Sequence, residues 1–462
     1  MSTIEQPRTL ETLSEQLRGE LITPEHADYD QARRIWNGMF DRRPVAVVRV
    51  QGAADVVAVV DHARETGAEL SVRGGGHSSA GYSTCDGIVL DFSRMKGVWV
   101  DADAKVARAQ AGALWGDLDR ETQAHGLALP GGQISHTGIA GLTLGGGIGW
   151  LSRQHGLTID NLLSVDLVTA DGRLVTASES ENPDLFWGLR GGSGNFGVVV
   201  SFEYRLHEVG PIVLGGPLFY ELDDAEEALR NAREYCRTAP DEISLWLVLT
   251  HVPPVPPFPE ERWGETVLAV APFCTDLERG SALLEPLTSF GSPLANLHGP
   301  LPYTALQSVL DVFDPHGNRY WERGDYLAEL SDGAIEALVA GARSMSSPRN
   351  EILVFPMGGA VARVPVDATA FGERTAPWAV WVVGQWTDAK EDAIHRDWTR
   401  DVAASLEPWT TGGVYVNAIG GDVTEARKLA AFGGGAKHDR LRELKRAWDP
   451  ENLFHLNHNI AP

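Results

Sequence analysis

A histidine that directly follows three glycines is the residue type and spacing best suited to chemistry in this sequence. The segment comes after a short run of strand-forming residues and consists of Arg73, Gly74, Gly75, Gly76, His77, Ser78 and, three residues further on, Gly81. Backbone without side chains can approach a phosphate closely and turn its N–H groups toward it, so the loop suits a nucleotide cofactor held beside His77. A tight surface turn next to an ordinary histidine would show the same short pattern, and the motif alone leaves both interpretations open.

Two further segments are rich in glycine. Residues 130–153 contain many glycines and few charges, which predicts irregular backbone packed against another part of the molecule. Residues 192–197 match the pattern GxGxxG, but a helix is expected before them and a strand after them. A dinucleotide-binding Rossmann loop requires the reverse order, so the sequence does not predict NAD binding.

Other catalytic patterns find no support. The sequence contains no GxSxG, HExxH or P-loop motif, which argues against a serine hydrolase, a zinc protease and an NTPase. His455 and His458 are spaced as a metal pair could be, but no third ligand follows, so packing roles are favoured and no metal is predicted. The three cysteines are widely separated and predict a reducing, cytoplasmic environment without disulfides.

Composition excludes several kinds of partner. The chain has 462 residues, and 39 Lys+Arg against 63 Asp+Glu give a formal net charge of −24, which argues against nucleic acid and anionic membranes. No apolar run reaches the roughly 20 residues of a membrane span. Residues 1–6 lack the basic and apolar regions of a signal peptide. The expected partners are a small-molecule substrate and O2, and the chain is expected to act as a monomer or a homodimer.

Hydrophobic periodicity divides the chain into two parts with different predicted secondary structure. Before about residue 207 it predicts a strand at 45–50, a helix at 55–66, a strand at 70–73 and a hairpin turning at Asp171-Gly172. After that it predicts an α+β domain on a mostly antiparallel sheet. The strands of that sheet are expected at 243–249, 266–270, 352–355 and 378–383, with helices at 224–236 and 332–343.

Three motifs in the right order carry a family resemblance. They are the loop at 73–82, the segment from Gly138 to Asn161, and a C-terminal stretch running from Tyr415 to Ile460. Together they resemble the berberine-bridge-enzyme-like branch of the vanillyl-alcohol-oxidase flavoproteins. The resemblance implies a two-domain, PCMH-type FAD-binding fold of the α+β class. Residues 1–207 would form the FAD-binding domain, 208–411 an antiparallel-sheet substrate domain, and 412–462 a segment that completes the FAD domain.

The resemblance also assigns cofactor contacts. His77 would bond covalently to the 8α position of FAD, and Ile134 stands where many relatives have a second, cysteinyl attachment, so no cysteinyl link is expected. Besides the loop at 73–81, the cofactor-binding residues are expected to be Gly138, Gly141, Gly146, Gly147, Gly194, Gly197, Val198, Asn417, Asn457 and Asn459.

Catalytic residues follow from the same comparison. Tyr415 matches a tyrosine that faces the substrate, and Thr137 lies where relatives control oxygen access beside the flavin. Leu353 occupies the place of the family's glutamate; Glu351, two residues earlier, is either its replacement or a surface carboxylate. Gln385 is a lesser candidate for the pocket.

The implied activity is that of a covalent FAD-linked oxidase. It would transfer a hydride from a phenolic, alcohol, amine or polyketide-like molecule to FAD and then pass the electrons to O2. His136 and Thr137 resemble the corresponding residues of bacterial enterocin-pathway oxygenases, and the chain is also similar to 6-hydroxynicotine oxidases. One alternative is therefore a flavin-N5-oxide oxygenase of secondary metabolism, and another is a flavin-binding protein without turnover.

Overall fold

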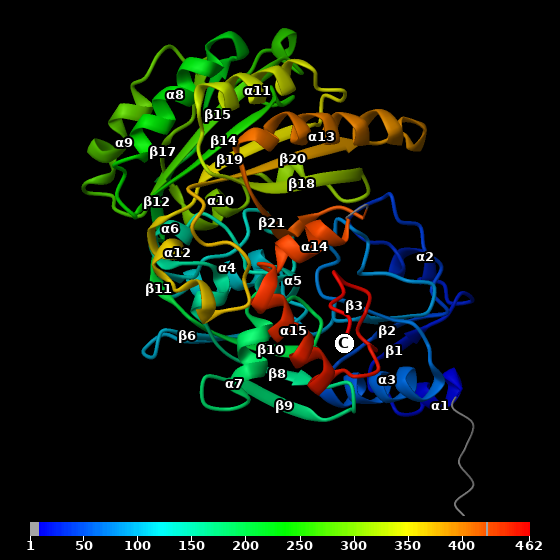
Figure 1. Ribbon diagram of the computed structural model, residues 1–462. Helices are drawn as coiled ribbons and strands as arrows, with labels where there is room; N and C mark the ends of the chain where they lie inside the picture. Colours follow the sequence, from blue (N-terminus) through cyan, green and yellow to red (C-terminus); the bar gives the residue numbers. More distant parts are fainter. Residues whose placement is uncertain (1–8, 422–423) are drawn as a thin grey trace, which may run out of the picture.

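The computed structural model describes residues 9–421 and 424–462, so the expectation for residues 1–6 lies outside the described part of the chain. Two halves are stacked on one another (Figure 1). One half contains a broad ten-stranded sheet covered by helices, and the other contains sheets of four and five strands. The chain passes from the second half into the ten-stranded sheet and returns at its C-terminus, drawn in red.

The four-stranded sheet carries the glycine loop. Its strands, in spatial order, are β1 (Glu20–Ile22), β2 (Ala46–Arg49), β4 (Ile88–Asp91) and β3 (Leu70–Arg73). Helix α3 (Ala53–Thr66) connects β2 to β3 as the periodicity predicts, although β4 lies between these two parallel strands. Val56, Val59 and Val60 bury one face of α3 against the sheet. The loop at 74–76 therefore starts from the end of a buried strand.

The five-stranded sheet contains the predicted hairpin. Its strands, in spatial order, are β5 (Val98–Asp101), β6 (Val106–Gln110), β10 (Val198–Arg205), β8 (Leu162–Val168) and β9 (Leu174–Ser178). The turn between β8 and β9 is closed by a hydrogen bond from Thr169 N to Arg173 O at 2.9 Å. Around it lie α4 (Trp115–Gln123), α5 (Ile139–Leu144), α6 (Ser152–His155) and α7 (Pro183–Leu189).

The ten-stranded sheet belongs to the segment predicted as α+β. Its main path is β16 (Ala295–Asn296), β13 (Leu218–Glu221), β15 (Thr266–Cys274), β14 (Ile243–His251), β19 (Glu351–Pro356), β20 (Trp378–Trp386), β18 (Arg319–Leu327) and β21 (Thr410–Ile419). Off this path, β12 (Ile212–Gly215) pairs with β15 and with β17 (Gly299–Pro302). The four predicted strands and both predicted helices are confirmed, and β12, β13, β16, β17, β18 and β21 were not predicted.

The two faces of this sheet have different partners. On one face Leu247, Val354 and Val382 pack beneath a row of helices, which are α8 (Ala225–Cys236), α9 (Gly280–Thr288), α11 (Asp332–Arg343) and α13 (Asp392–Leu406). On the other face Val248 and Leu353 belong to a second apolar cluster, which continues into the other half of the molecule. The sheet is therefore buried on both sides, and its second face borders the site described below.

The C-terminal segment links the halves. Strand β21 pairs with β18, so the expected domain boundary at 411/412 falls inside a strand of the ten-stranded sheet. After α14 (Glu425–Ala431), α15 (Gly435–Trp448) packs on α7 and buries Leu441 in the core of the other half. The remaining short elements are α1 (Leu10–Ser14), α2 (Tyr29–Ala32), β7 (Leu127–Ala128), β11 (His207–Glu208), α10 (Tyr303–Gln307) and α12 (Gly359–Arg363). None of the described helices has the length and apolar character needed to span a membrane.

Candidate functional site

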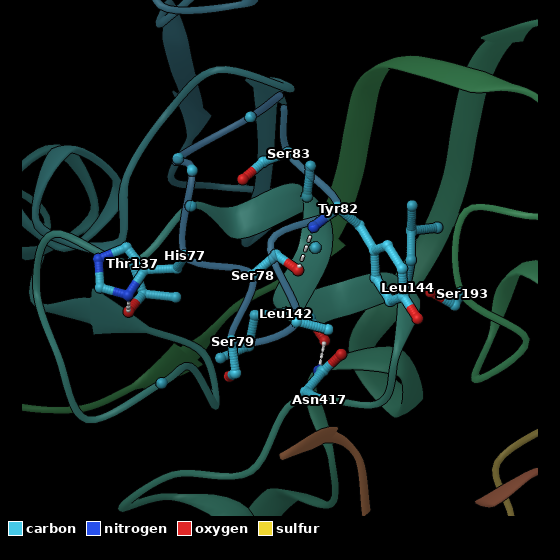
Figure 2. Close-up of a pocket in the computed structure, with 18 of the residues that line it drawn as sticks. His77, Ser78, Ser79, Tyr82, Ser83, Thr137, Leu142, Leu144, Ser193 and Asn417 are labelled. Carbon is cyan, nitrogen blue, oxygen red and sulfur yellow. Dashed lines mark hydrogen bonds between the residues drawn. The ribbon is translucent and has the colours of Figure 1, made fainter. Parts of the chain in front are cut away.

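A cavity of about 350 Å³ lies where the two halves meet. The glycine loop, residues 132–144 and residues 193–199 line it from one half, and β18 to β21 line it from the other. Residues 454–458 near the C-terminus complete the wall. Figure 2 shows His77 and Thr137 together at one end of the labelled group, with Tyr82 and Ser193 at the other and Ser78 between them.

The glycine loop is formed by a close approach of two backbone segments. A Cβ on Gly75 would lie 2.3 Å from the backbone nitrogen of Gly138, and a Cβ on Gly138 would lie equally close to Gly75. Only glycine at both positions allows this contact. Arg73 supports the loop from behind, because its buried guanidinium donates to Ala32 O at 2.6 Å and pairs with Asp91.

Most of the predicted cofactor residues line the cavity, and five do not. Those on its wall are Gly74, Gly75, Gly76, His77, Ser78, Gly138, Gly141, Gly194, Gly197, Val198, Asn417 and Asn457. Arg73, Gly81, Gly146, Gly147 and Asn459 do not line it. Gly81 has a φ of +77°, and a Cβ there would meet the ring of Phe40. Gly81 therefore lets the loop pack against Phe40 without contributing to the cavity wall itself.

The wall fits a large cofactor with polar groups. Gly141 and Gly194 line the cavity and have no atom within 4 Å of the place a Cβ would take, so any side chain there would occupy the cavity. Ser83 Oγ, Asn457 Oδ1 and His458 Nδ1 are buried on the same wall without a hydrogen-bond partner in the described structure. Buried polar atoms require partners, which the polar parts of a bound nucleotide would supply. Sequence reasoning missed Ser83 and gave His458 a packing role.

His77 is held in a cluster of aromatic rings. Its Nε2 lies 2.7 Å from His136 Nδ1, its Nδ1 lies 3.4 Å from Thr137 Oγ1, and Trp36 stacks on the ring at 4.8 Å between centroids. Burial, together with His136 and His316, holds the pKa of His77 well below its usual value. The imidazole is therefore neutral, with one ring nitrogen able to act as a nucleophile. His136 contacts His77 from behind and does not line the cavity.

The structure also assembles a histidine group that sequence spacing did not indicate. One ring nitrogen from each of His77, His136 and His316 lies within 4.8 Å of the others, a geometry that could hold a metal ion. His136 and His316 come from loops far apart in the chain, so only the fold brings them together. The pair considered from the sequence does not meet at a common site: His455 is exposed, and His458 lines the cavity.

Tyr415 lies on β21 at the cavity wall. Its oxygen accepts hydrogen bonds from Gly147 N at 3.2 Å and from Asn417 Nδ2 at 3.1 Å. Its ring stacks on Trp381, with centroids 5.6 Å apart and planes 4° apart. Burial raises the pKa of Tyr415 to about 12. Near pH 7 the phenol therefore keeps its proton and can donate a hydrogen bond, but it is a poor base.

Three carboxyl groups face the cavity. Glu351 lines it and accepts a hydrogen bond from Thr250 Oγ1 at 3.4 Å, so the surface-carboxylate alternative is wrong. Glu322 and Asp314 line it as well, and neither was found from the sequence. Burial raises the pKa of Glu351 and of Glu322 to about 8, and it raises that of Asp314 well above its usual value.

The structure also places three further residues that the sequence analysis named. Gln385 does not line the cavity, because its amide turns away and donates to Tyr320 Oη at 2.6 Å. That lesser pocket candidate is therefore wrong. Ile134 and Leu353, which the resemblance places at the family's cysteine and glutamate positions, line the cavity with apolar side chains.

Comparison with known proteins identifies this arrangement. The model of an FAD binding domain matches residues 44–178, and the berberine and berberine-like model matches residues 414–461. An FAD-linked oxidoreductase of Dictyostelium discoideum is 32% identical over 455 residues, which cover 97% of this chain and 96% of that protein. The chain belongs to the berberine-bridge-enzyme-like family of FAD-linked oxidoreductases. The (R)-6-hydroxynicotine oxidase of Paenarthrobacter nicotinovorans, another relative, is 30% identical over 461 residues, covering 96% and 97% of the two chains.

Solved structures agree over the whole length. The crystal structure of 6-hydroxy-D-nicotine oxidase from Arthrobacter nicotinovorans matches with a TM-score of 0.87 and 27% identity, covering 100% of both chains. The berberine-bridge-like protein 1 of Physcomitrella patens has the same fold, with a TM-score of 0.87 at 24% identity over 98% and 99% of the two chains. The predicted fold class is confirmed. The protein is an FAD-linked oxidoreductase, and its cofactor is FAD.

Proposed function

We propose that this protein is an oxidase of a small or medium-sized organic molecule, with FAD bonded to His77 and O2 as the final electron acceptor. The observation that carries the proposal is the position of His77. It ends a glycine loop on the wall of the cavity, is neutral, and lies in the same cavity as Tyr415 and Glu351. A nucleophilic nitrogen, a cofactor cradle and polar side chains thus share one site.

His77 would be the single covalent attachment. A bond from a ring nitrogen to the 8α carbon withdraws electrons and makes the flavin a stronger oxidant. Ile134 places no thiol on the wall where a cysteinyl link would form. The glycine loop would hold the pyrophosphate with backbone N–H groups, and Asn457 and His458 would contact other polar parts of the cofactor.

The bound FAD would accept a hydride from the substrate. Side chains of the protein would orient the substrate and accept the proton that it loses. Tyr415 would orient the substrate through its hydroxyl, since its raised pKa keeps it protonated. Glu351 would take the proton that the substrate loses, once it is ionised. Thr137, whose hydroxyl lies 3.4 Å from His77 Nδ1, would control the access of O2 to the bound flavin.

The names of relatives do not fix the substrate. They include a 6-hydroxynicotine oxidase, a chitooligosaccharide oxidase and a xylooligosaccharide oxidase solved with xylobiose. A screen of phenols, alcohols and amines that records both flavin bleaching without oxygen and hydrogen peroxide release in air tests the proposal. Bleaching without peroxide would indicate a dehydrogenase. Labelled oxygen in the product would indicate an oxygenase, and either result would contradict the oxidase.

A further inference from the structure

The carboxyl groups of the cavity form one row on the ten-stranded sheet. Glu351 on β19 and Glu322 on β18 are both paired with Val383 of the central strand β20. All three residues line the cavity, so their side chains share one face. Two strand spacings place the two glutamate Cα atoms roughly 10 Å apart. An apolar valine thus separates two acids across a gap wide enough for a small substrate group.

A third acid and a tryptophan ring line the same cavity as these two glutamates. Asp314 lines the cavity beside His77, with its Oδ2 3.8 Å from His77 Nδ1. Trp381, which lies two residues before Val383 on β20, also lines the cavity and stacks against Tyr415. Aromatic rings attract cations above their faces. The cavity therefore combines three acids with an electron-rich ring.

Positive charge is missing from the same cavity. Among the described residues, no lysine or arginine lines it. Ser79 Oγ and Thr250 Oγ1 donate to Glu322 and Glu351, but hydroxyl groups cannot neutralise a carboxylate. Buried carboxylates without a cation are strongly disfavoured. A ligand that brings a positive charge would allow the two glutamates to ionise and pair with it.

We propose that the substrate is an organic cation, a protonated amine on an apolar or aromatic body, bound between Glu322 and Glu351 and oxidised at the carbon next to nitrogen. This inference rests on the proposed function and narrows its substrate class. A neutral alcohol or a carbohydrate would bring no positive charge to pair with the acids. An anionic carboxylic acid would add negative charge to a part of the cavity that has no basic side chain among the described residues.

The chemistry explains why two acids are useful. An ionised glutamate takes one proton from the ammonium group and leaves a neutral amine. The adjacent C–H bond then breaks with its electron pair, the hydride passes to FAD, and a C=N bond forms. The product is an iminium cation. O2 takes up the two electrons, the hydrogen of the hydride and the proton held by the glutamate, which gives hydrogen peroxide and restores the carboxylate. The second glutamate, still ionised, stabilises the positive charge that develops on the substrate.

Paired ligands of equal size test the inference on the holoenzyme. Size-graded amines and their alcohols, starting with benzylamine and benzyl alcohol, are titrated without oxygen while the flavin spectrum reports binding and reduction. Each amine should bind more tightly than its alcohol. Glu322→Gln should weaken amine binding by about 30-fold, the smallest loss expected when one partner of a buried charge pair is removed, and should leave alcohol binding unchanged.

Asp325→Asn is the matched control. Asp325 is a carboxyl on the same strand, but it pairs with Arg427 and does not line the cavity. Its loss should not change the preference for the amine. The comparison of paired ligands on wild-type protein needs no variant, so it remains decisive if Glu322→Gln fails to load FAD.

Two different failures can be told apart. Alcohols that bind as tightly as their amines, or a panel in which no amine binds, would overturn the cation site and leave the oxidase intact. Amines that bind without bleaching the flavin or releasing peroxide would contradict the oxidase and leave the cation site in place.

Discussion

At the scale of single residues, the neutral state of His77 decides how it can react. Its ring is enclosed by Trp36, His136 and Thr137, and burial disfavours the charged form. A protonated imidazole has no free lone pair, whereas a neutral one has. The enclosure therefore leaves His77 with the lone pair that the proposed bond to FAD requires.

Removing His77 should release the cofactor from the chain but not abolish its binding. We expect the flavin of the wild-type protein to remain with the polypeptide after acid precipitation, and that of His77→Ala to appear in the supernatant. The absorbance of both fractions measures this. His455→Ala, which changes an exposed histidine outside the cavity, is the control. Wild-type protein that loses its flavin on precipitation would disprove the covalent link.

The hydroxyl of Tyr415 should matter more than its ring. Tyr415→Phe keeps the stacking on Trp381 but removes the oxygen that accepts from Gly147 and Asn417. We expect the rate of flavin reduction to fall by about 100-fold, the lower end for a lost proton or hydrogen-bond role, with FAD retained. Tyr326→Phe removes a buried hydroxyl that has no hydrogen-bond partner and should change the rate little. Equal rates for wild type and Tyr415→Phe would remove Tyr415 from the mechanism.

A glutamate base should give a distinct pH profile. Glu351 can take a proton only after losing its own, and burial raises its pKa to about 8. The rate of flavin reduction at saturating substrate should therefore rise with pH and level off above about 8. Glu322 has a similar pKa, so Glu351→Gln must be compared with Glu322→Gln. A rising limb that survives in Glu351→Gln at full amplitude would assign the base to another group.

At the scale of elements, the glycines near the cavity have two different roles. Gly75 and Gly138 allow two backbone segments to pack together, whereas Gly141 leaves space in the cavity. Gly75→Ala would press a methyl group onto the backbone of Gly138. We expect a lower melting temperature as well as loss of FAD. Gly141→Ala adds a methyl group that meets no protein atom within 4 Å, so the melting temperature of the FAD-free protein should not fall while FAD loading drops. Calorimetry and flavin content measure both effects. Full FAD loading in Gly141→Ala would show that this part of the wall does not contact FAD.

Local sequence signals were sufficient for the elements but not for their assembly. The glycine loop, the hairpin at Asp171-Gly172 and helix α11 were predictable because turn chemistry and periodicity act over a few residues. Glu322 was not, because strand β18 was not predicted and its pairing with β20 joins residues about 60 positions apart. Asp314 lies in the irregular segment before β18, where no local pattern shows what the side chain faces. Glu351 remained ambiguous for the same reason: a strand pattern shows which residues share a face but not what that face borders.

At the scale of the whole molecule, the position of the cavity makes FAD a link between the halves. The glycine loop contacts it from one half, β18 to β21 from the other, and the C-terminal segment closes it. FAD binds only the folded arrangement, so the melting temperature of flavin-free His77→Ala should rise with added FAD. At 100 times the dissociation constant the stabilisation is about 2.7 kcal/mol, which for a chain of 462 residues corresponds to a rise of roughly 3 °C. Riboflavin lacks the groups that would meet Asn457 and His458, and it should raise the melting temperature less. Scanning calorimetry over a range of ligand concentrations measures the effect, and a melting temperature independent of FAD would show that the cofactor does not bridge the two halves.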